Sequence, residues 1–388
     1  MSHANLLGAS PLPRFFAVDG LHDGPPATGD GQTVRVMVRS LSVMQKEALV
    51  AISGESRAWR LVSDEGDYLE GFDEAPPPLA FLSTGMVASY LGELLALAAA
   101  RGIETDGIRL TLDNYYTMQG SALRGTMVGG ADHPVLTLEC SALAGRREDA
   151  LGLLFDATGA SPMYGLVSGL RGGTFALLHN GARIDPGEIA GQELAVEPDD
   201  DAAFSLLHPA DGGTWEALLE RGGRTPRAPE ATSAPGSSLA ETQDRRLHVR
   251  AVCTPRDDGL WSIEQSMFNP QGTMFRFLCD PAGMRAPGPL AYAAAGIGFC
   301  FMTQLGRYAK ITRRDLSRYA IVQDIVFTPG GATGGTGCAG GAGAPQTTVS
   351  IESGEDADFV RQLLKMGEQT CFLHALCRTA LRTRIAFD

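Results

Sequence analysis

Two stretches of this 388-residue chain decide its fold: residues 78–89 (PLAFLSTGMVAS) and residues 289–300 (PLAYAAAGIGFC). They align without a gap at an offset of 211 residues. Each begins with proline, which the first turn of a helix tolerates because its missing N–H would be unpaired there. Both open long apolar runs, residues 78–101 and 289–311, that lack a polar face, and such helices are buried. The sequence therefore predicts one buried central helix in each half of the chain.

Two further matches follow the same order along the chain. Residues 161–164 (SPMY) match residues 371–374 (CFLH) at an offset of 210, and residues 59–64 (WRLVSD) resemble residues 275–280 (FRFLCD) at an offset of 216. Offsets that drift by only a few residues are what loop insertions between two copies of one unit would produce. The sequence therefore predicts an internal duplication.

Each copy has the same coarse plan. Alternating segments typical of strands precede the apolar helix, two more strands follow it, and a last helix closes the unit. The predicted strands are residues 33–39, 57–63, 108–116 and 134–141 in the first copy and 247–253, 274–279, 319–327 and 346–353 in the second; the closing helices are 147–155 onward and 355–382. This plan predicts an α+β fold in which sheets wrap around two buried central helices.

The rest of the chain divides around the two copies. Residues 1–32 are rich in Pro, Gly and Asp and are expected to form an irregular lead-in to the first copy, residues 33–185. Residues 186–245 connect the copies and include a Pro/Ser-rich stretch, 222–245, typical of a solvated linker. The second copy is expected to span residues 246–388.

Composition excludes several classes of protein. The net charge of −13 argues against a general binder of nucleic acid or of anionic membranes. No run of about 18 apolar residues is free of charges and breakers, and the start of the chain has no secretion signal, so we expect no membrane span and a cytoplasmic protein. In that setting the seven cysteines are expected to be reduced, catalytic or buried rather than joined in structural disulfides.

The cysteine pattern of the second copy resembles that of the OsmC/Ohr family (osmotically inducible protein C and organic hydroperoxide resistance protein). Members carry one cysteine in a long buried helix, 11 residues after a proline, and a second cysteine in a helix near the chain end. Here Cys300 lies 11 residues after Pro289, and Cys371 supplies the second element. The resemblance covers residues 247–388 and, through the internal match, residues 32–185. It implies an intertwined dimer, which a tandem duplication would place within one chain as an intramolecular pseudo-dimer.

The resemblance implies a thiol-dependent peroxidase that reduces organic hydroperoxides. The thiolate of Cys300 would attack the O–O bond and become a sulfenic acid, and Cys371 would condense with it to a disulfide that a dithiol reductant resets. The apolar helix around Cys300 favours an apolar hydroperoxide as substrate. The first copy has Ser89 and Ser161 in place of the cysteines and is expected to be redox-dead, because a serine hydroxyl is scarcely ionised at neutral pH.

One feature of the family is missing near the thiol. Members usually carry a glutamate one or two positions after the proline, which orients an arginine near the thiol, whereas this chain has Leu290 and Ala291 there. Because burial raises the pKa of a thiol, another group has to lower it. Arg276, in an apolar strand before the helix, is the first candidate, and Arg250 and Arg307 are the others.

Other interpretations stay open at this point. His374 lies three residues after Cys371 on the same helix face, and either polarises that thiol or a substrate, or is a packed structural histidine. The two cysteines could instead be small buried hydrophobes. Cys300 could attack a carbonyl or another small electrophile rather than a peroxide. The chain could also be a non-catalytic module that holds an apolar small molecule, and association into a homodimer is left open.

No cofactor or metal is predicted. A formal GxGxxG at residues 335–340 is followed by a β-like segment rather than a helix, so the glycine-rich stretch 329–345 is expected to be a hairpin loop. Cys377 is six residues from Cys371 and is expected on the other side of the helix as a bystander. No CxxC or HxxxH spacing supports a zinc site around these residues.

Overall fold

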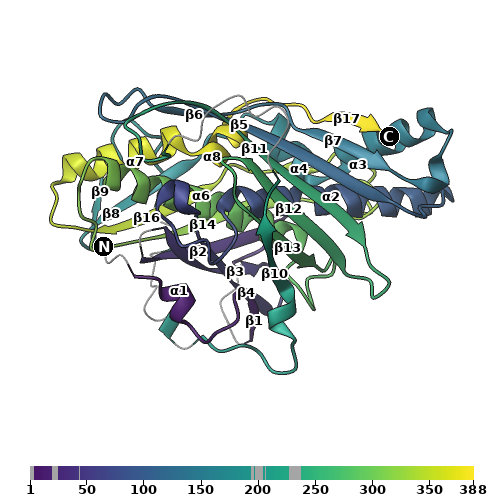
Figure 1. Cartoon of the computed structure of the whole chain (residues 1–388), viewed down its shortest axis with the longest axis horizontal. Helices are drawn as coiled ribbons and strands as arrows, with labels where there is room; N and C mark the ends of the chain where they lie inside the picture. Colours follow the sequence, from purple (N-terminus) through teal and green to yellow (C-terminus); the bar gives the residue numbers. More distant parts are fainter. Residues whose placement is uncertain are drawn as a thin grey trace.

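The computed structural model of the chain describes residues 4–19, 25–42, 44–193, 196, 204–205, 207–226 and 237–388. Two β-sheets and two long helices make up most of the molecule (Figure 1). The α+β class expected from the sequence is confirmed.

The first sheet joins strands from both halves of the chain. It contains β1 (Phe16–Asp19), β2 (Gln32–Ser42), β3 (Gln45–Ile52), β4 (Arg57–Ser63), β8 (Thr174–His179), β9 (Ala182–Ile184), β14 (Arg318–Thr328), β15 (Gly341–Ala342) and β16 (Gln346–Glu352). The order is β1-β4-β3-β2-β14-β16-β8-β9, and β15 pairs with β14. The antiparallel β2–β14 pair, with Val38 opposite Ile321, connects the two halves, and β8 lies parallel to β16.

The second sheet repeats this arrangement with the halves exchanged. It contains β5 (Arg109–Ser121), β6 (Val128–Ala131), β7 (Val135–Glu139), β10 (Leu219–Arg224), β11 (Thr242–Pro255), β12 (Trp261–Asn269), β13 (Thr273–Cys279) and β17 (Arg384–Phe387). The order is β10-β13-β12-β11-β5-β7-β17, and β6 pairs with β5. Here β11 of the second half pairs with β5 of the first, and β17 lies parallel to β7. Each half therefore completes a sheet begun by the other.

The central helices α2 (Pro78–Arg101) and α6 (Pro289–Ile311) begin and end where the sequence predicted. They pack against each other, α6 against β2, β3 and β14 of the first sheet and α2 against β5, β11 and β12 of the second. The order of layers is thus sheet, helix, helix, sheet. A methyl group on Gly85 would meet the backbone N of Ala293 at 2.5 Å, and one on Gly296 would meet the backbone N of Leu82 at 2.6 Å. The two helix backbones touch at these matched glycines.

The closing helix of each half is broken in two. In the first half α3 (Arg147–Ala160) ends at Ser161 and α4 (Pro162–Ser168) follows; in the second, α7 (Ala357–Thr370) ends at Cys371 and α8 (Phe372–Arg378) follows. The single helix expected over residues 355–382 is therefore wrong. A helix N-cap needs a non-helical backbone, and residues 161 and 371 both adopt extended φ/ψ angles.

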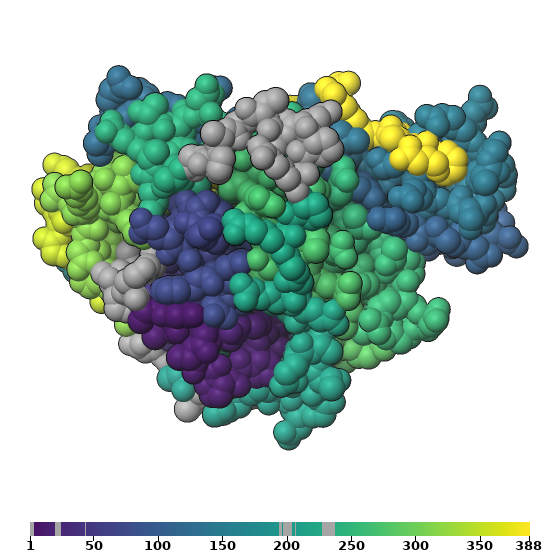
Figure 2. Space-filling view, in the orientation of Figure 1, coloured from purple at the N-terminus to yellow at the C-terminus, as the bar shows by residue number. Residues whose placement is uncertain are grey.

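Two segments expected to be irregular contribute structure. Residues 1–32 include α1 (Leu6–Ala9) and β1, which pairs with β4, and Figure 2 shows these residues, in purple, as part of one face of the molecule. Residues 186–245 include the 3-10 helix η3 (Trp215–Leu218), strand β10 and the start of β11. Residues 227–236 of the expected linker lie outside the described part of the chain.

Of the helices in the described ranges, α2 has the length and composition of a membrane span. However, 78% of the most apolar stretch of α2 is buried inside the molecule. A helix in the core of a globular fold has the same apolar composition.

The contact between the helices predicts the effect of one methyl group. Gly85→Ala would push that group into the backbone of α6, and overpacking of this kind costs about 1–3 kcal/mol of unfolding free energy. Gly152→Ala is the matched control because Gly152 also lies inside a helix but has open space around it. We expect a lower melting temperature for the first variant and an unchanged or slightly higher one for the second. Equal melting temperatures would contradict the close approach of α2 and α6.

Candidate functional site

The structure brings the two candidate cysteines together. Cys300 lies in the middle of α6 and Cys371 lies at the break between α7 and α8; both are reduced and buried, with 2% and 0% of their surface exposed. Burial raises the pKa of Cys300, the neighbouring Cys371 side chain raises it further, and the backbone N–H of Leu373 lowers it, so both residues lie close to the Cys300 thiol. Because Cys371 is the N-cap of α8, its Sγ accepts the backbone N–H of His374 at 3.4 Å.

Ser89 and Ser161 make the matching contact in the first half. Their hydroxyl oxygens lie 2.7 Å apart and are buried. Ser161 is the N-cap of α4 and accepts the N–H of Met163 at 3.1 Å, as Cys371 does from residue 374 in α8. The position expected for the missing thiols is therefore occupied by a hydrogen-bonded pair of hydroxyls.

A cavity of about 20 Å³ lies beside Cys300. A single buried water needs about 10–15 Å³, so the cavity is no larger than a small polar molecule. Both halves of the chain form its walls. They are Glu65, Tyr68, Leu69, Pro78, Leu79, Arg245, Leu247, Met267, Pro270, Thr303, Gln304, Arg307 and Phe372.

Arg307 brings a buried positive charge to this cavity. It lies two helical turns after Cys300; its Nε donates to the carbonyl oxygen of Ser238 at 2.7 Å and its Nη1 to Oε1 of Gln304 at 3.2 Å. Its Nη2 is buried and has no hydrogen-bond partner among the described residues. Burial and then the charge of Arg245 lower the pKa of Arg307 to about 9, although Glu65 acts in the opposite direction, so the group stays cationic at neutral pH.

Glu65 and Arg245 form a second charged group at the cavity. The Tyr68 hydroxyl donates to Oε2 of Glu65 at 2.6 Å. Burial raises the pKa of Glu65 to about 7, although the Tyr68 hydrogen bond and the charges of Lys46 and Arg245 act in the opposite direction. The Nε of Arg245 is buried without a hydrogen-bond partner within the described residues. Glu65 is therefore a carboxyl that changes its charge near neutral pH.

Ser238 connects the polar groups around the cavity. Its N–H donates to the carbonyl oxygen of Tyr68 at 2.9 Å, its own carbonyl accepts from Arg307, and its hydroxyl accepts from Arg245. Sequence reasoning missed Ser238 and Arg245 because both lie in the Pro/Ser-rich stretch expected to be a linker. One signal was present for Arg245: it continues the inward-facing alternation of β11, two positions before Leu247.

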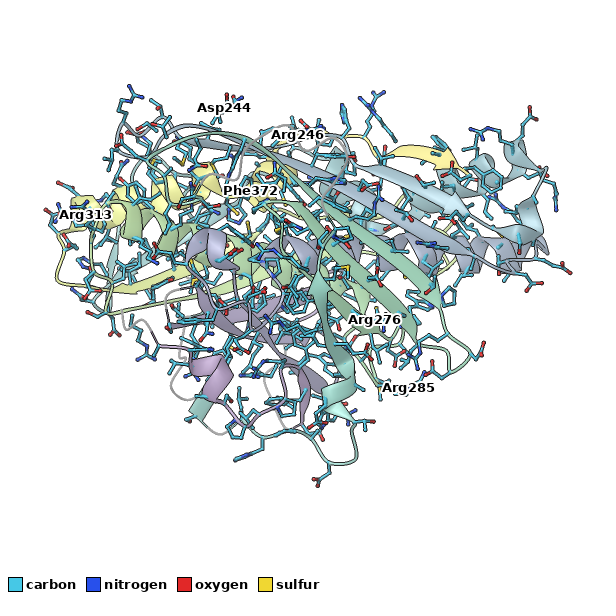
Figure 3. All side chains as sticks on the ribbon, in the orientation of Figure 1. Asp244, Arg246, Arg276, Arg285, Arg313 and Phe372 are labelled. Carbon is cyan, nitrogen blue, oxygen red and sulfur yellow. The ribbon has the colours of Figure 1, made fainter. Side chains whose placement is uncertain are left out.

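Arg276 does not lie at the thiol as the sequence analysis expected. Its side chain is half exposed and pairs with Glu220 at 2.7 Å and with Glu264 at 3.7 Å. The reason is strand alternation, because Phe275 and Phe277 face the core and the residue between them faces solvent. Figure 3 shows Arg276 well away from Phe372, which lines the cavity.

Of the other two arginine candidates, one is also paired elsewhere. Arg250 forms two hydrogen bonds with Asp113, at 2.9 and 3.0 Å, and is partly exposed. Arg307 is thus the candidate that the structure places at the cavity.

His374 is a packed histidine. Its ring stacks on Phe301 with centroids 4.9 Å apart and meets the edge of Phe175 at 5.7 Å. Neither ring nitrogen has a hydrogen-bond partner in the described part of the chain, and burial lowers the pKa of His374 to about 3, so the ring is neutral. Its hydrogen bond to Cys371 is made by its backbone N–H.

Cys377 lies in α8, six residues after Cys371. It is buried, and burial followed by the neighbouring Cys371 raises its pKa. The buried Tyr116 phenol has its pKa raised by burial and then by Cys300, Cys377 and Cys371.

The glycine-rich loop closes the serine half of the molecule. A Cβ on Gly331 would meet Cβ of Ala160 at 2.3 Å, and one on Gly340 would meet the carbonyl carbon of Ser161 at 2.2 Å. Thr333 in the same loop donates to the buried carboxylate of Glu93. The glycines thus allow a close backbone contact with the end of α3. Among the described residues, no group of three His, Cys, Asp or Glu could hold a metal ion.

Comparison with known proteins gives little. No protein-family model matches the chain, and no curated protein matches it. One similar solved structure is an OsmC-like hydroperoxide resistance protein from Jannaschia sp. CCS1, with 22% identity, 31% of this chain and 79% of that chain covered, and a TM-score of 0.21. This likeness is too slight to carry an argument about fold or function.

The raised pKa of Glu65 predicts a pH dependence of stability. A glutamate in the unfolded chain has a pKa of 4.5, and burial raises the pKa of Glu65 to about 7 in the folded protein, so the folded state binds this proton more tightly. The stability that protonation contributes is full below about pH 4.5 and is lost as the pH rises through about 7.

Glu65→Gln cannot lose this proton. The variant should therefore lose less unfolding free energy than the native protein between pH 5 and pH 8, as measured by urea unfolding. Glu104→Gln, at an exposed carboxyl, is the control and should follow the native protein. An unchanged pH dependence in Glu65→Gln would contradict the buried, proton-binding state of Glu65.

Proposed function

We propose that this chain is a thiol-dependent peroxidase that reduces organic hydroperoxides at the Cys300–Cys371 pair. The observation that carries the proposal is that Cys300, with the reduced Cys371 as its neighbour, lines one small cavity together with the buried guanidinium of Arg307. Two buried thiols alone would be ordinary core packing. A buried charge with an unpartnered donor costs free energy, and such costs are concentrated at functional sites.

We infer further that the fold is an OsmC-like intertwined dimer contained in one duplicated chain. Reciprocal strand pairing supports this, because β2–β14 and β11–β5 exchange the roles of the two halves. A matched turn also supports it. Asp64 accepts the N–H groups of Glu65, Phe72 and Glu74, and Asp280 accepts those of Ala282, Met284 and Arg285.

The proposed reaction balances in two steps. In the first, the sulfur of Cys300 donates an electron pair to the terminal peroxide oxygen, the O–O bond breaks, and the alkoxide takes up the proton that the thiol released. The products are the Cys300 sulfenic acid and an alcohol. In the second, the sulfur of Cys371 attacks the sulfenic sulfur of Cys300 and the S–S bond forms. The displaced hydroxide takes up the proton of the Cys371 thiol and leaves as water. A dithiol reductant then returns two electrons and two protons to the disulfide.

Charged residues at the cavity would stabilise the Cys300 thiolate and exchange its proton. Burial, and then the Cys371 side chain, raise the pKa of Cys300 well above the usual range, so the resting thiol is protonated at neutral pH. The guanidinium groups of Arg307 and Arg245 would stabilise the thiolate and the departing alkoxide as negative charge develops. Glu65, with its pKa of about 7, would exchange the proton between thiol and alkoxide. Glu65 would thus replace the glutamate that is absent after Pro289.

The cavity wall also bears on the substrate. Leu69, Leu79 and Phe372 in the cavity wall favour an apolar hydroperoxide as substrate, and because the closed cavity holds about 20 Å³, these side chains would have to move apart to admit its apolar part. A dithiol reductant and a cytoplasmic setting accompany this chemistry.

Replacement of single cysteines tests the proposed roles. Cys300→Ser should abolish consumption of cumene hydroperoxide in a peroxide assay with a dithiol reductant, because no sulfenic acid can form. Cys371→Ser should accumulate a Cys300 sulfenic acid that dimedone traps and mass spectrometry detects, whereas the native protein should not. Cys338→Ser, at the exposed cysteine, is the control and should keep full activity. Full activity in Cys300→Ser would refute the proposal.

Replacement of two arginines tests which one serves the thiol. Arg307→Gln should lower the rate constant for oxidation of Cys300 by about 100-fold, the usual effect of removing one preorganised donor. Arg276→Gln removes the same charge from the solvent face of β13 and should leave this rate unchanged. Stopped-flow measurement of Cys300 oxidation compares the two, and an equal effect of both variants would contradict the assignment to Arg307.

A further inference from the structure

A second, much larger cavity opens over the serine half of the molecule. It is a groove of about 1300 Å³ between the end of α2, helices α3 and α4, the glycine-rich loop and residues 380–385. Figure 1 shows the end of α2 together with α3, α4 and β17 at the same end of the molecule. None of the residues that line this groove lines the Cys300 cavity, so the two sites are separate.

Five large apolar side chains line the groove. They are Leu97, Phe155, Tyr164, Leu381 and Ile385. Phe155 is 69% exposed and Tyr164 is 43% exposed, which is unusual for large aromatic side chains. A ligand that covered them would recover the free energy of burying apolar surface.

Comparison of the two halves shows that this exposed aromatic is not required by the fold. Phe155 follows the buried Leu153 and Leu154, and at the same offset of 210 the second half has Lys365. Lys365 pairs with Glu188 at 2.6 Å and points into solvent as expected of a surface position. The first half thus has an aromatic group where the second has a solvated charge.

The groove also carries an excess of positive charge. Two arginines and one acid line it, and Arg101 already pairs with Asp156 at 2.5 Å. The backbone N–H of Arg382 donates to His133, but its guanidinium has no hydrogen bond or ion pair to the residues that the structure describes. A guanidinium binds a carboxylate through two parallel hydrogen bonds.

From these features we infer that the groove binds a linear apolar carboxylic acid. The carboxylate pairs with the guanidinium of Arg382, and the alkyl chain lies along Phe155 and Tyr164. The groove exceeds the range of about 300–1,000 Å³ typical of small-ligand pockets, so a long chain has room. The site does not depend on the proposed peroxidase activity, because it shares no residue with the Cys300 cavity.

An exposed cysteine in the groove gives a direct readout of occupancy. Cys338 lines the groove, and every other cysteine is buried. Dodecanoate should slow the alkylation of Cys338 by N-ethylmaleimide in the native protein, followed by peptide mass spectrometry. Methyl dodecanoate has the same chain without the charge and should protect far less. Equal protection by the ester, or none by the acid, would overturn the inference.

Variants locate the binding site. Phe155→Asp and Arg382→Gln should each weaken binding of dansyl-labelled undecanoic acid by about tenfold or more, the usual effect of losing a charge-assisted hydrogen bond or its equivalent in apolar contact. Leu123→Asp and Arg276→Gln change exposed residues elsewhere and should bind as the native protein does. Cys300→Ser should also bind normally. Loss of binding in Cys300→Ser with normal binding in Phe155→Asp would place the acid at the other cavity and overturn the inference.

Discussion

The contact between α2 and α6 at Gly85 and Gly296 is the constraint on which the rest of the structure depends. Because the two backbones touch, each helix has one remaining broad face, and a sheet covers it. Residues four positions apart lie on the same helix face, so Ser89 and Cys300 follow the crossing glycines by one turn. The same contact therefore fixes the layers of the fold and the depth at which the Cys300 sulfur lies.

The two matched sites have diverged around this common frame. At the position of Arg307 the first half has Ala96, and at the position of Gln304 it has Glu93, which holds the glycine-rich loop. The cysteine site instead receives Glu65 and Tyr68 from the long loop after β4 and Ser238 from the segment before β11. In the proposed duplication, the first half supplies walls of the Cys300 cavity in the second half. The backbone of the glycine-rich loop covers the serine pair of the first half.

Features that depend on local pattern could be predicted from the sequence. The bounds of α2 and α6 follow from a proline and an unbroken apolar run. The pairing of Cys300 with Cys371 follows from the resemblance to the OsmC/Ohr family, and the internal match places Ser89 and Ser161 at the corresponding positions. These patterns need no knowledge of the tertiary path. The same holds for the glycine-rich hairpin, whose flanking segments are both β-like.

Features that depend on the path of the chain could not be predicted. Arg276 was preferred because an apolar strand surrounds it, but the period of two between Phe275 and Phe277 directs it to solvent. Glu65 and Ser238 are polar residues in loops, and only the folded chain shows that both are buried beside Arg307. Composition reports how polar a segment is on average, and a single buried serine in a Pro/Ser-rich stretch does not change that average.

The central claim is that one chain holds one reactive thiol pair. The most direct test is the intact mass of the protein after one equivalent of cumene hydroperoxide, followed by peptide mapping without reduction. The account predicts the loss of two hydrogens and a single crosslinked peptide pair that contains Cys300 and Cys371, with the other five cysteines still reduced. Free thiols at Cys300 and Cys371 after the peroxide has been consumed, or a disulfide that joins two chains, would contradict it.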